Sequence, residues 1–442
     1  MAEALAFGLQ AAEEALRCQD NEAAELTLRR AQEAADALRQ KEAPLSESEA
    51  LKLSTLSGTL DCRLGRFKRA SELLQAASAE AERLGDWIAQ TDALFQLAQA
   101  QVGLGELEEG AKTAGAASLV ARRGQDTERD RTARVLHAAA LNRQGRFGEA
   151  EKMLEVLLSE CDGATSKRIQ AQVRKELASI HLKAGAFEEA DVGAQAALAL
   201  ARASGDRQVE YEALSTVGVV KMESGQPAAA LEPLTGALRL SRALFLRRRE
   251  AIDLANLGES YFELGNHEQA LSHFQEALSI FKEIQDRACE GDCTVNIGRA
   301  LLSQGKAAEA VSALERGAEL CSQTGRAEYW GLASQCLAEA HLGAGRLEEA
   351  QLHFEKAERL FFQHWPQQLW KAELGLARVA AAKCQTELGL LYARRAAQRV
   401  TELQASLSRI PGAAACLRGA SQVLELLRML QGENPTHETI GS

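Results

Sequence analysis

Glycine recurs every 40 residues over most of this chain, at Gly65, Gly105, Gly145, Gly185, Gly225, Gly265, Gly305 and Gly345. Two small residues accompany each of these glycines: one stands five positions after it, as Ala270 does, and the other stands seven positions before it, as Gly258 does. Eight recurrences at three linked positions indicate a repeat array, in which each unit buries its apolar face against its neighbours. The fold and the function must therefore be inferred from one 40-residue unit and from the differences between its copies.

Each unit has the pattern of two helices joined by a tight turn. Apolar residues recur at helical spacing before the glycine, as at Leu254 and Leu257, and again after it, as at Phe274. Glycine takes most easily the left-handed conformation that ends a helix, and small side chains on either side let two helix backbones approach closely. The spacing therefore predicts an antiparallel helix pair in every unit.

The unit around Gly265 resembles a known family. The segment from Asn256 to Ala270, with Phe274 and Leu278 after it, carries small, aromatic, glycine and alanine residues in the order found in the tetratricopeptide repeat family. The family unit has about 34 residues, and the longer unit of this chain adds about one and a half to two helical turns to each pair. Units of this length are similar to those of G-protein signalling modulators that orient mitotic spindles and to those of bacterial regulatory arrays. The resemblance implies an all-α fold, a right-handed α-solenoid (superhelix) of antiparallel helix pairs.

The repeat pattern weakens at both ends of the chain. We expect residues 1–43 to form a degenerate first repeat, residues 44–366 to form eight 40-residue units and residues 367–408 to form a ninth, degenerate unit. Apolar residues recur at helical spacing within 409–430, which predicts a single helix that caps the end of the stack. The polar segment 431–442 has no such periodicity, and we expect it to be disordered.

The sequence contains no pattern for catalysis, for a cofactor or for a metal. It lacks the phosphate-binding, dinucleotide-binding, nucleophile-elbow and zinc-protease motifs, and its eight histidines and nine cysteines do not occur at ligand spacings. We therefore expect neither an enzyme nor a cofactor. Scattered cysteines indicate a reducing compartment, and the lack of a signal peptide or a long apolar stretch predicts a cytoplasmic protein without membrane insertion.

Binding is the remaining class of function, and the resemblance implies a concave groove lined by the first helix of each pair. The inner positions of these helices, counted from Gly258, are mostly basic in the first units and mostly acidic in the later ones, so a ligand of complementary polarity would dock in one direction. The predicted groove residues are Asn142, Lys175, Lys183, Glu212, Asn256, Glu259, Glu263, Asn296 and Arg299. In the spindle-orientation relatives, asparagines at the place of Asn256 and Asn296 hold the backbone of an extended peptide. Solvated helix faces without a partner are the alternative.

Two further surfaces compete with the groove. The first is the turn that carries Arg247, Arg248 and Arg249, which would anchor an acidic partner or is a solvated helix terminus. Nucleic acid is disfavoured by the net charge of −11 and by the lack of a continuous basic face. The second is an aromatic cluster at the junction of units eight and nine, which either packs that joint or forms an interface. Its candidate contact residues are Phe362, Trp365 and Trp370.

We therefore expect a noncatalytic scaffold that binds a segment of a partner protein in the concave groove. The alternative is a regulatory or sensor arm, of the kind found in bacterial arrays, that controls a separate effector such as a kinase, a protease or a transcription activator. The sequence leaves the identity of the partner and the oligomeric state open.

Overall fold

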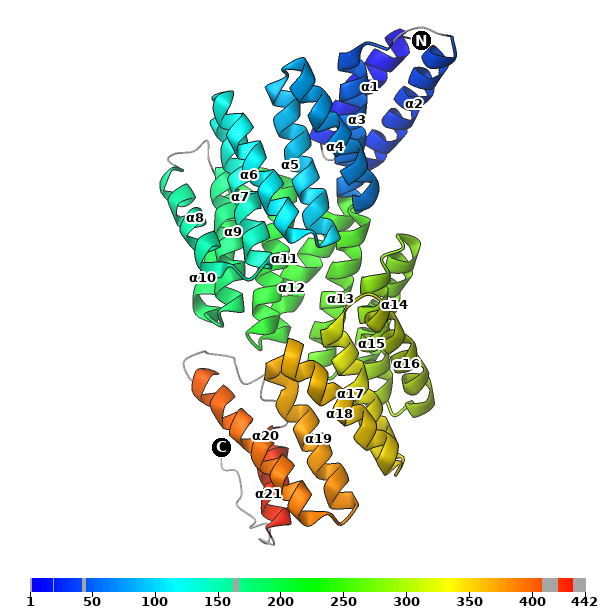
Figure 1. Cartoon of the computed structure of the whole chain (residues 1–442), viewed down its shortest axis with the longest axis vertical. Coiled ribbons are helices and arrows are strands. Elements are labelled where there is room, and N and C mark those ends of the chain that lie inside the picture. Colours follow the sequence, from blue (N-terminus) through cyan, green and yellow to red (C-terminus); the bar gives the residue numbers. More distant parts are fainter. Residues whose placement is uncertain (1, 19, 42–44, 162–166, 408–419, 432–442) are drawn as a thin grey trace. The chain divides into compact units, whose positions relative to one another are not determined.

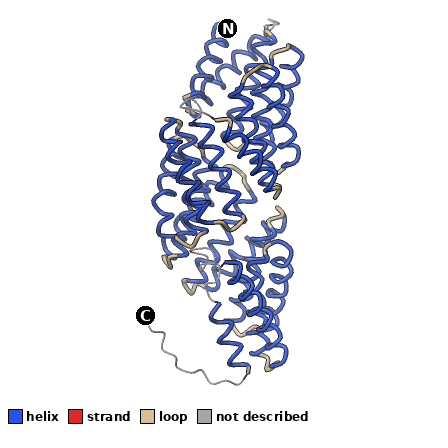
Figure 2. The backbone as a smooth tube through the Cα atoms, turned by 90° about the vertical axis from the view of Figure 1, so that its left-hand side faces the viewer, coloured by secondary structure: helices blue, strands red, loops and turns tan. Residues whose placement is uncertain are grey.

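The computed structural model of the chain describes residues 2–18, 20–41, 45–161, 167–407 and 420–431. Within these residues every regular element is a helix and no strand is present (Figure 2). The chain divides into two compact units: the first comprises residues 1–220 and 232–250, and the second comprises residues 221–231 and 251–442. Consecutive helices pack against each other from the first to the tenth helix and from the fourteenth to the last, and the predicted all-α solenoid is confirmed.

Helices alternate between the first member of a pair, called the A helix, and the second, called the B helix (Figure 1). The first six A helices are α1 (Ala2–Arg17), α3 (Glu47–Arg63), α5 (Trp87–Leu104), α7 (Thr127–Arg143), α9 (Lys167–Lys183) and α11 (Arg207–Glu223). Their B helices are α2 (Asn21–Gln40), α4 (Phe67–Leu84), α6 (Leu107–Arg123), α8 (Phe147–Ser159), α10 (Phe187–Ser204) and α12 (Pro227–Ala243). The division between the units falls within α11, α12 and the next A helix.

The remaining pairs belong mainly to the second unit. They are α13 (Arg247–Glu263) with α14 (His267–Glu283), α15 (Arg287–Ser303) with α16 (Ala307–Gln323), α17 (Ala327–Gly343) with α18 (Leu347–His364), and α19 (Leu369–Ala382) with α20 (Thr386–Leu407). A short 3-10 turn, Pro366–Gln368, precedes α19, and α21 (Ala420–Leu430) follows the last pair. None of the helices that the structure describes combines the length and the apolar character needed to cross a membrane.

The A helices form one layer within each unit. In the first unit α3 contacts α5, α5 contacts α7 and α7 contacts α9; in the second unit α15 contacts α17 and α17 contacts α19. Side chains at equivalent positions of neighbouring A helices therefore lie one repeat apart on the same face of the layer. This arrangement places the predicted groove residues in rows.

The recurrent glycines end the A helices in the left-handed conformation, as predicted. All eight, from Gly65 to Gly345, have φ between 74° and 86°. At three of the turns between repeats, Gln125, Phe245 and Gln285 take the same conformation, with φ of 59°, 52° and 58°. For a residue with a Cβ atom this conformation is unfavourable by about 1–2 kcal/mol, so these three turns are strained.

Where the small residue seven positions before the turn glycine is itself glycine, it lies under a side chain of the B helix. A Cβ atom added to Gly258 would lie 2.7 Å from the ring of Phe274, which is 0% exposed. Gly298 faces Leu314 in the same way, with a Cβ distance of 2.6 Å. The close approach lets each pair bury a large apolar side chain, and full burial of such a side chain stabilises the fold by about 1.5–3 kcal/mol.

The last described helix packs on the final pair. Val423 of α21 is fully buried in a cluster with Trp370 of α19 and Val400 of α20. The predicted capping segment is thus helical from Ala420 onward, whereas its residues 409–419 lie outside the described residues. The predicted disordered tail also lies outside them, apart from Gln431.

Candidate protein-binding surfaces

In the first unit, an ion-paired cluster joins neighbouring A helices. Nζ of Lys175 on α9 lies 2.8 Å from Oε2 of Glu212 on α11 and 2.9 Å from Oε1 of Glu176. Burial opposes the charge of Lys175, but the two carboxylates outweigh burial, so the pKa of Lys175 is raised. Burial likewise opposes the charge of Glu212, and Lys175 outweighs it, so the pKa of Glu212 is lowered. Two predicted groove residues therefore bind each other across adjacent repeats.

Asn142 and Lys183 form a second link between A helices of the first unit. Nζ of Lys183 at the end of α9 donates to Oδ1 of Asn142 on α7 at 3.0 Å and to its backbone oxygen at 3.3 Å. The amide nitrogen of Asn142 donates to Oγ of Ser179 at 3.2 Å, and Asn142 is only 2% exposed. The sequence places Asn142 on the exposed inner face, and the structure corrects this: the side chain is buried and ties α7 to α9. Lys183 itself is exposed.

In the second unit, Arg299 on α15 binds Glu259 on α13. The guanidinium donates to the carboxylate at distances of 3.0, 3.2 and 3.3 Å, and it also donates to Oδ1 of Asn296 at 2.9 Å. Its carbon lies 4.5 Å from the ring centroid of Phe262, a cation–π contact. Burial opposes the charge of Arg299, and Glu259 outweighs it, so the pKa of Arg299 is raised. Asn296, predicted on the exposed inner face, is only 6% exposed and supports this pair.

Asn256 and Glu263 flank this pair on α13. The side-chain amide of Asn256 is half-buried and makes no hydrogen bond within the part of the chain that the structure describes. Glu263, also half-buried, belongs to an acidic group with Glu259 and Glu223. Burial, followed by the charges of Glu259 and Glu263, raises the pKa of Glu223. The second unit thus keeps the acidic character that the sequence predicts for its inner positions.

The arginine turn lies at the start of α13, within the first unit. Arg247 lies 2.7 Å from Oε2 of Glu250, which is 6% exposed. The guanidinium of Arg248 lies 5.8 Å from the ring centroid of Phe67, and Arg249 is exposed. Phe245, which precedes them in the strained left-handed conformation, is 43% exposed. The three arginines therefore differ in their exposure and in their contacts.

The predicted aromatic cluster is separated in the structure. Phe362 on α18 is 66% exposed, whereas Trp370 is only 2% exposed. Trp365 is half-buried and packs edge-on against Phe361, with ring centroids 6.1 Å apart. Trp370 is buried because α19 begins at Leu369, directly after the 3-10 turn, which directs this ring toward α20 and α21. Trp370 is therefore a core residue, and Phe362 is the ring of this group that a partner can reach.

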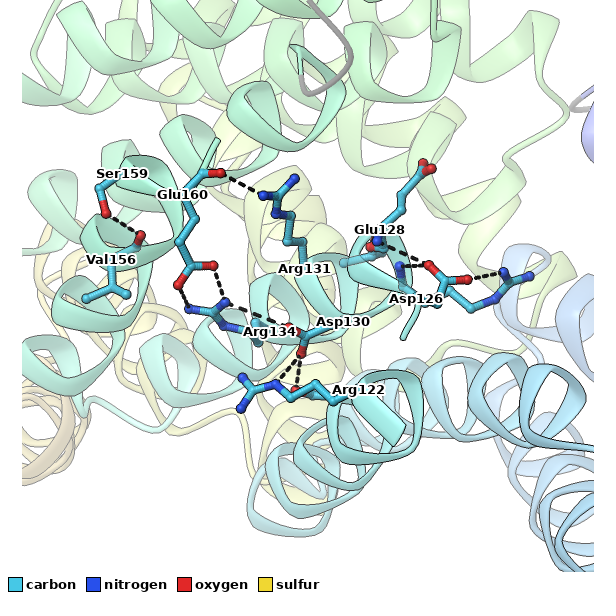
Figure 3. Close-up of polar contacts among 12 residues, drawn as sticks. Arg122, Asp126, Glu128, Asp130, Arg131, Arg134, Val156, Ser159 and Glu160 are labelled. Atoms are coloured by element: carbon cyan, nitrogen blue, oxygen red, sulfur yellow. Dashed lines mark hydrogen bonds and ion pairs between the residues drawn. The ribbon is translucent and has the colours of Figure 1, made fainter. Parts of the chain in front are cut away.

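A network of charged residues that the repeat pattern does not reveal lies near the end of α8 (Figure 3). Arg134 lies 2.5 Å from Oε2 of Glu160 and 3.9 Å from Asp130, which also binds Arg122 at 3.0 Å. Arg131 donates to the backbone oxygen of Glu160 at 2.7 Å, and this bond caps the C-terminal end of α8. Arg131 and Arg134, three residues apart on α7, were the available sequence signal. The network stabilises the end of α8, and its charged groups satisfy one another.

No metal centre is present among the described residues, since no three His, Cys, Asp or Glu side chains gather closely enough to hold an ion. The eight cysteines within the described ranges are all free thiols, and four of them are buried. Burial raises the pKa of the Cys62 thiol to about 12, and it also raises the pKa of Cys293. These two buried cysteines therefore remain protonated at neutral pH.

A family model described as tetratricopeptide repeat matches residues 248–323, which comprise nearly all of the two helix pairs from α13 to α16. The same helix pair recurs along both units. Residues 248–323 therefore carry tetratricopeptide repeats. The family inferred from the residues around Gly265 is therefore confirmed.

Solved structures share the fold of this chain. A signal transduction ATPase with numerous domains from Pyrococcus horikoshii, which has a tetratricopeptide repeat sensor, is 15% identical with a TM-score of 0.57; the match covers 78% of this chain and 54% of that one. This chain thus spans about half the length of that structure.

Two further structures align along most of their own length. The apo quorum sensor NprR from B. thuringiensis is 17% identical with a TM-score of 0.52, and the match covers 71% of this chain and 86% of that one. A Rap protein complexed with competence and sporulation factor is 16% identical with a TM-score of 0.50, with coverage of 87% and 99%. At these identities the likeness is one of fold. No curated protein sequence matches the chain at a significant level.

Proposed function

We propose that this tetratricopeptide repeat protein is a noncatalytic scaffold that binds a segment of a partner protein along its A helices. The observation that supports the proposal is the way the predicted groove residues hold one another. Lys175 binds Glu212, and Arg299 binds Glu259, each pair about one repeat apart. Side chains fixed in advance lose little rotamer entropy when a ligand binds. A row that presents one or two polar groups per repeat suits an extended or helical segment that runs past several repeats.

Asn256 is the side chain in the second unit best suited to hold such a segment. Its amide offers a donor and an acceptor, and it makes no hydrogen bond within the described residues. The neighbouring Arg299 and Glu259 are engaged with each other. Because the charges of Arg299 and Glu259 neutralise each other, the amide of Asn256 would bind a peptide backbone whatever the net charge of that peptide.

The test is affinity capture of partners from the native cell extract with two charge-matched variants. Asn256→Arg places a bulky cation on the A helix α13, and Gln275→Arg places the same cation on an exposed position of the B helix α14. We expect Asn256→Arg to lose a stoichiometric partner that Gln275→Arg retains, after both variants show equal helicity by circular dichroism. Retention by both variants would contradict the A-helix surface, and the absence of any stoichiometric partner would contradict the scaffold.

A regulatory or sensor arm that controls a separate effector is the second candidate. Two proteins of similar fold are described as a tetratricopeptide repeat sensor and a quorum sensor, and the same peptide-binding surface serves such a role. If a captured partner is an enzyme, its activity is measured with and without this chain. A change in activity favours the regulatory arm, whereas binding without a change favours the scaffold.

A further inference from the structure

The chain of the first unit returns to contact its own beginning. Nδ2 of Asn21, the first residue of α2, donates to the backbone oxygen of Leu244, directly after α12, at a distance of 2.8 Å. The two residues are 223 positions apart in the sequence, and each is only 2% exposed. The turn from α12 to α13 is therefore joined to the N-terminal helix pair.

The amide of Asn21 is oriented from its other side by the end of α3. Nη1 of Arg63 donates to the backbone oxygen of Leu16 at 2.8 Å and lies 3.4 Å from Oδ1 of Asn21. A guanidinium has donors only, so it requires the amide oxygen on its side and leaves the amide nitrogen for Leu244. One buried side chain thus holds the end of α3 and the turn after α12 together.

Arg248, in the first turn of α13, makes a second contact between the same parts of the unit. Its guanidinium carbon lies 5.8 Å from the ring centroid of Phe67 at the start of α4, within the range of a cation–π contact. Its aliphatic stem packs on the turn between α3 and α4, where a Cβ atom added to Gly65 would lie 3.2 Å from Cδ of Arg248. The start of α13 therefore lies against the second helix pair (Figure 1).

Asn21 departs from the repeat pattern at its position. The residue two positions after the turn glycine is large and apolar in most units, as Phe67, Leu107, Phe147, Phe187 and Leu347 show. A buried amide in the same place needs hydrogen-bond partners, and Arg63 and Leu244 supply them. This exchange of an apolar side chain for an amide indicates that the sequence specifies the contact with Leu244.

The two sides of the contact have separate apolar cores. Leu244 belongs to a cluster of residues from α9 to α12, whereas Phe67 packs against a cluster from α3 to α5. Among the described residues, no apolar cluster joins the two sides, which meet through a hydrogen bond, a cation–π contact and the stem of Arg248. Such contacts open at a lower free energy than a shared core does.

We propose that the contacts of Asn21 with Leu244 and of Arg248 with Phe67 form a latch, which closes the first unit on itself and opens while its helix pairs stay folded. The helices from α5 to α11 lie between the two sides of the latch along the chain. The closed latch fixes their curvature, and the open latch releases it. A ligand that fits one curvature would favour one state of the latch. The latch goes beyond the proposed partner binding, and its test needs no partner.

The test is single-molecule energy transfer in the full chain, between dyes attached through noncanonical amino acids at the exposed Arg30 on α2 and Arg239 on α12. Asn21→Asp keeps the shape of the side chain and an oxygen toward Arg63, but it replaces the donor to Leu244 by a second oxygen. A carboxylate in the first turn of a helix is otherwise favourable.

Asn266→Asp is the control variant. It adds the same charge at the N-cap of α14 and keeps the oxygen that accepts from the backbone of Gln269. We expect Asn21→Asp to raise the ratio of a low-transfer population to the main population at least about tenfold, because it leaves a buried carbonyl without its donor. Asn266→Asp should change this ratio by less than about twofold. Far-ultraviolet circular dichroism should show equal helicity for both variants.

Asn21→Leu removes the donor without adding a charge, and it serves alone if Asn21→Asp melts early. We expect it to raise the same ratio at least about threefold. An unchanged ratio in both Asn21 variants would overturn the latch, and so would a rise in Asn21→Asp that Asn21→Leu does not share, since the added charge would then be the cause. A low-transfer population that appears only with a loss of helical signal would also overturn it, because the contact would then belong to the folded core.

Discussion

Replacing Arg299 by methionine leaves Glu259 without its counter-charge. The two side chains are 16% and 26% exposed and are joined by hydrogen bonds of 3.0, 3.2 and 3.3 Å. Two unit charges about 4 Å apart attract each other by about 4 kcal/mol at an effective dielectric constant of about 20. Removal of one partner of a buried pair costs about 3–5 kcal/mol. Because both side chains keep some exposure, we expect Arg299→Met to lower the free energy of unfolding by about 3 kcal/mol, at the lower end of this range.

The assay is urea unfolding of the full chain followed by far-ultraviolet circular dichroism, with Glu259→Gln and the double variant Glu259→Gln/Arg299→Met completing a cycle. The double variant contains no isolated charge at this position, so we expect it to recover at least about 1.5 kcal/mol of the loss. Equal slopes of the unfolding transitions are required for the comparison. Single effects that add within about 0.5 kcal/mol would refute the conclusion that these two groove residues stabilise each other.

Three further predictions concern stability. Gly258→Ala should lower the free energy of unfolding by about 1–3 kcal/mol, because the new Cβ atom would lie 2.7 Å from the ring of Phe274. Gly148→Ala should raise the free energy of unfolding by about 0.5–1 kcal/mol, because its Cβ atom would meet nothing within 4 Å. Urea unfolding measures both changes. Gln285→Gly should raise the melting temperature, because it relieves the left-handed strain at φ 58°. Burial, and then the charge of His341, lower the pKa of His353 in the folded chain. Near and below about pH 6.5 the unfolded chain therefore binds more protons at this histidine than the folded chain does, so the free energy of unfolding should fall as the pH drops below about 6.5. Melting at pH 7.5 and 5.5 should show this fall in the wild type and a smaller one in His353→Leu.

The sequence predicts the helix pairs because the features that specify them are local. Gly265 ends an A helix through its own conformation, and Gly258 admits a ring that follows it by 16 residues. Both effects repeat with the 40-residue period, so a single unit describes the rest. The acidic inner positions of the second unit were predictable for the same reason, since Glu223, Glu259 and Glu263 face one another at related positions.

The contacts between repeats could not be predicted, because they depend on how far each helix pair rotates relative to the next. Asn142 sits at a position expected to be exposed, yet Lys183 and Ser179 of the next A helix bind its side chain. Asn296 accepts a hydrogen bond from Arg299 of its own helix, and Arg299 in turn binds Glu259 of the preceding repeat. Arg248 at the start of α13 lies over the ring of Phe67 on α4, a relation that no local pattern encodes. Trp370 is buried because the irregular joint before α19 shifts the register of the helical face.

Site-specific photo-crosslinking tests whether a partner segment binds along the A helices. A photoreactive amino acid replaces Asn256 on α13 in one sample and the exposed Gln275 on α14 in the other, and each chain is irradiated in native extract. We expect a partner protein to crosslink from position 256 and not from position 275. Crosslinking from position 275 alone, or from neither position while a partner is still captured, would contradict it.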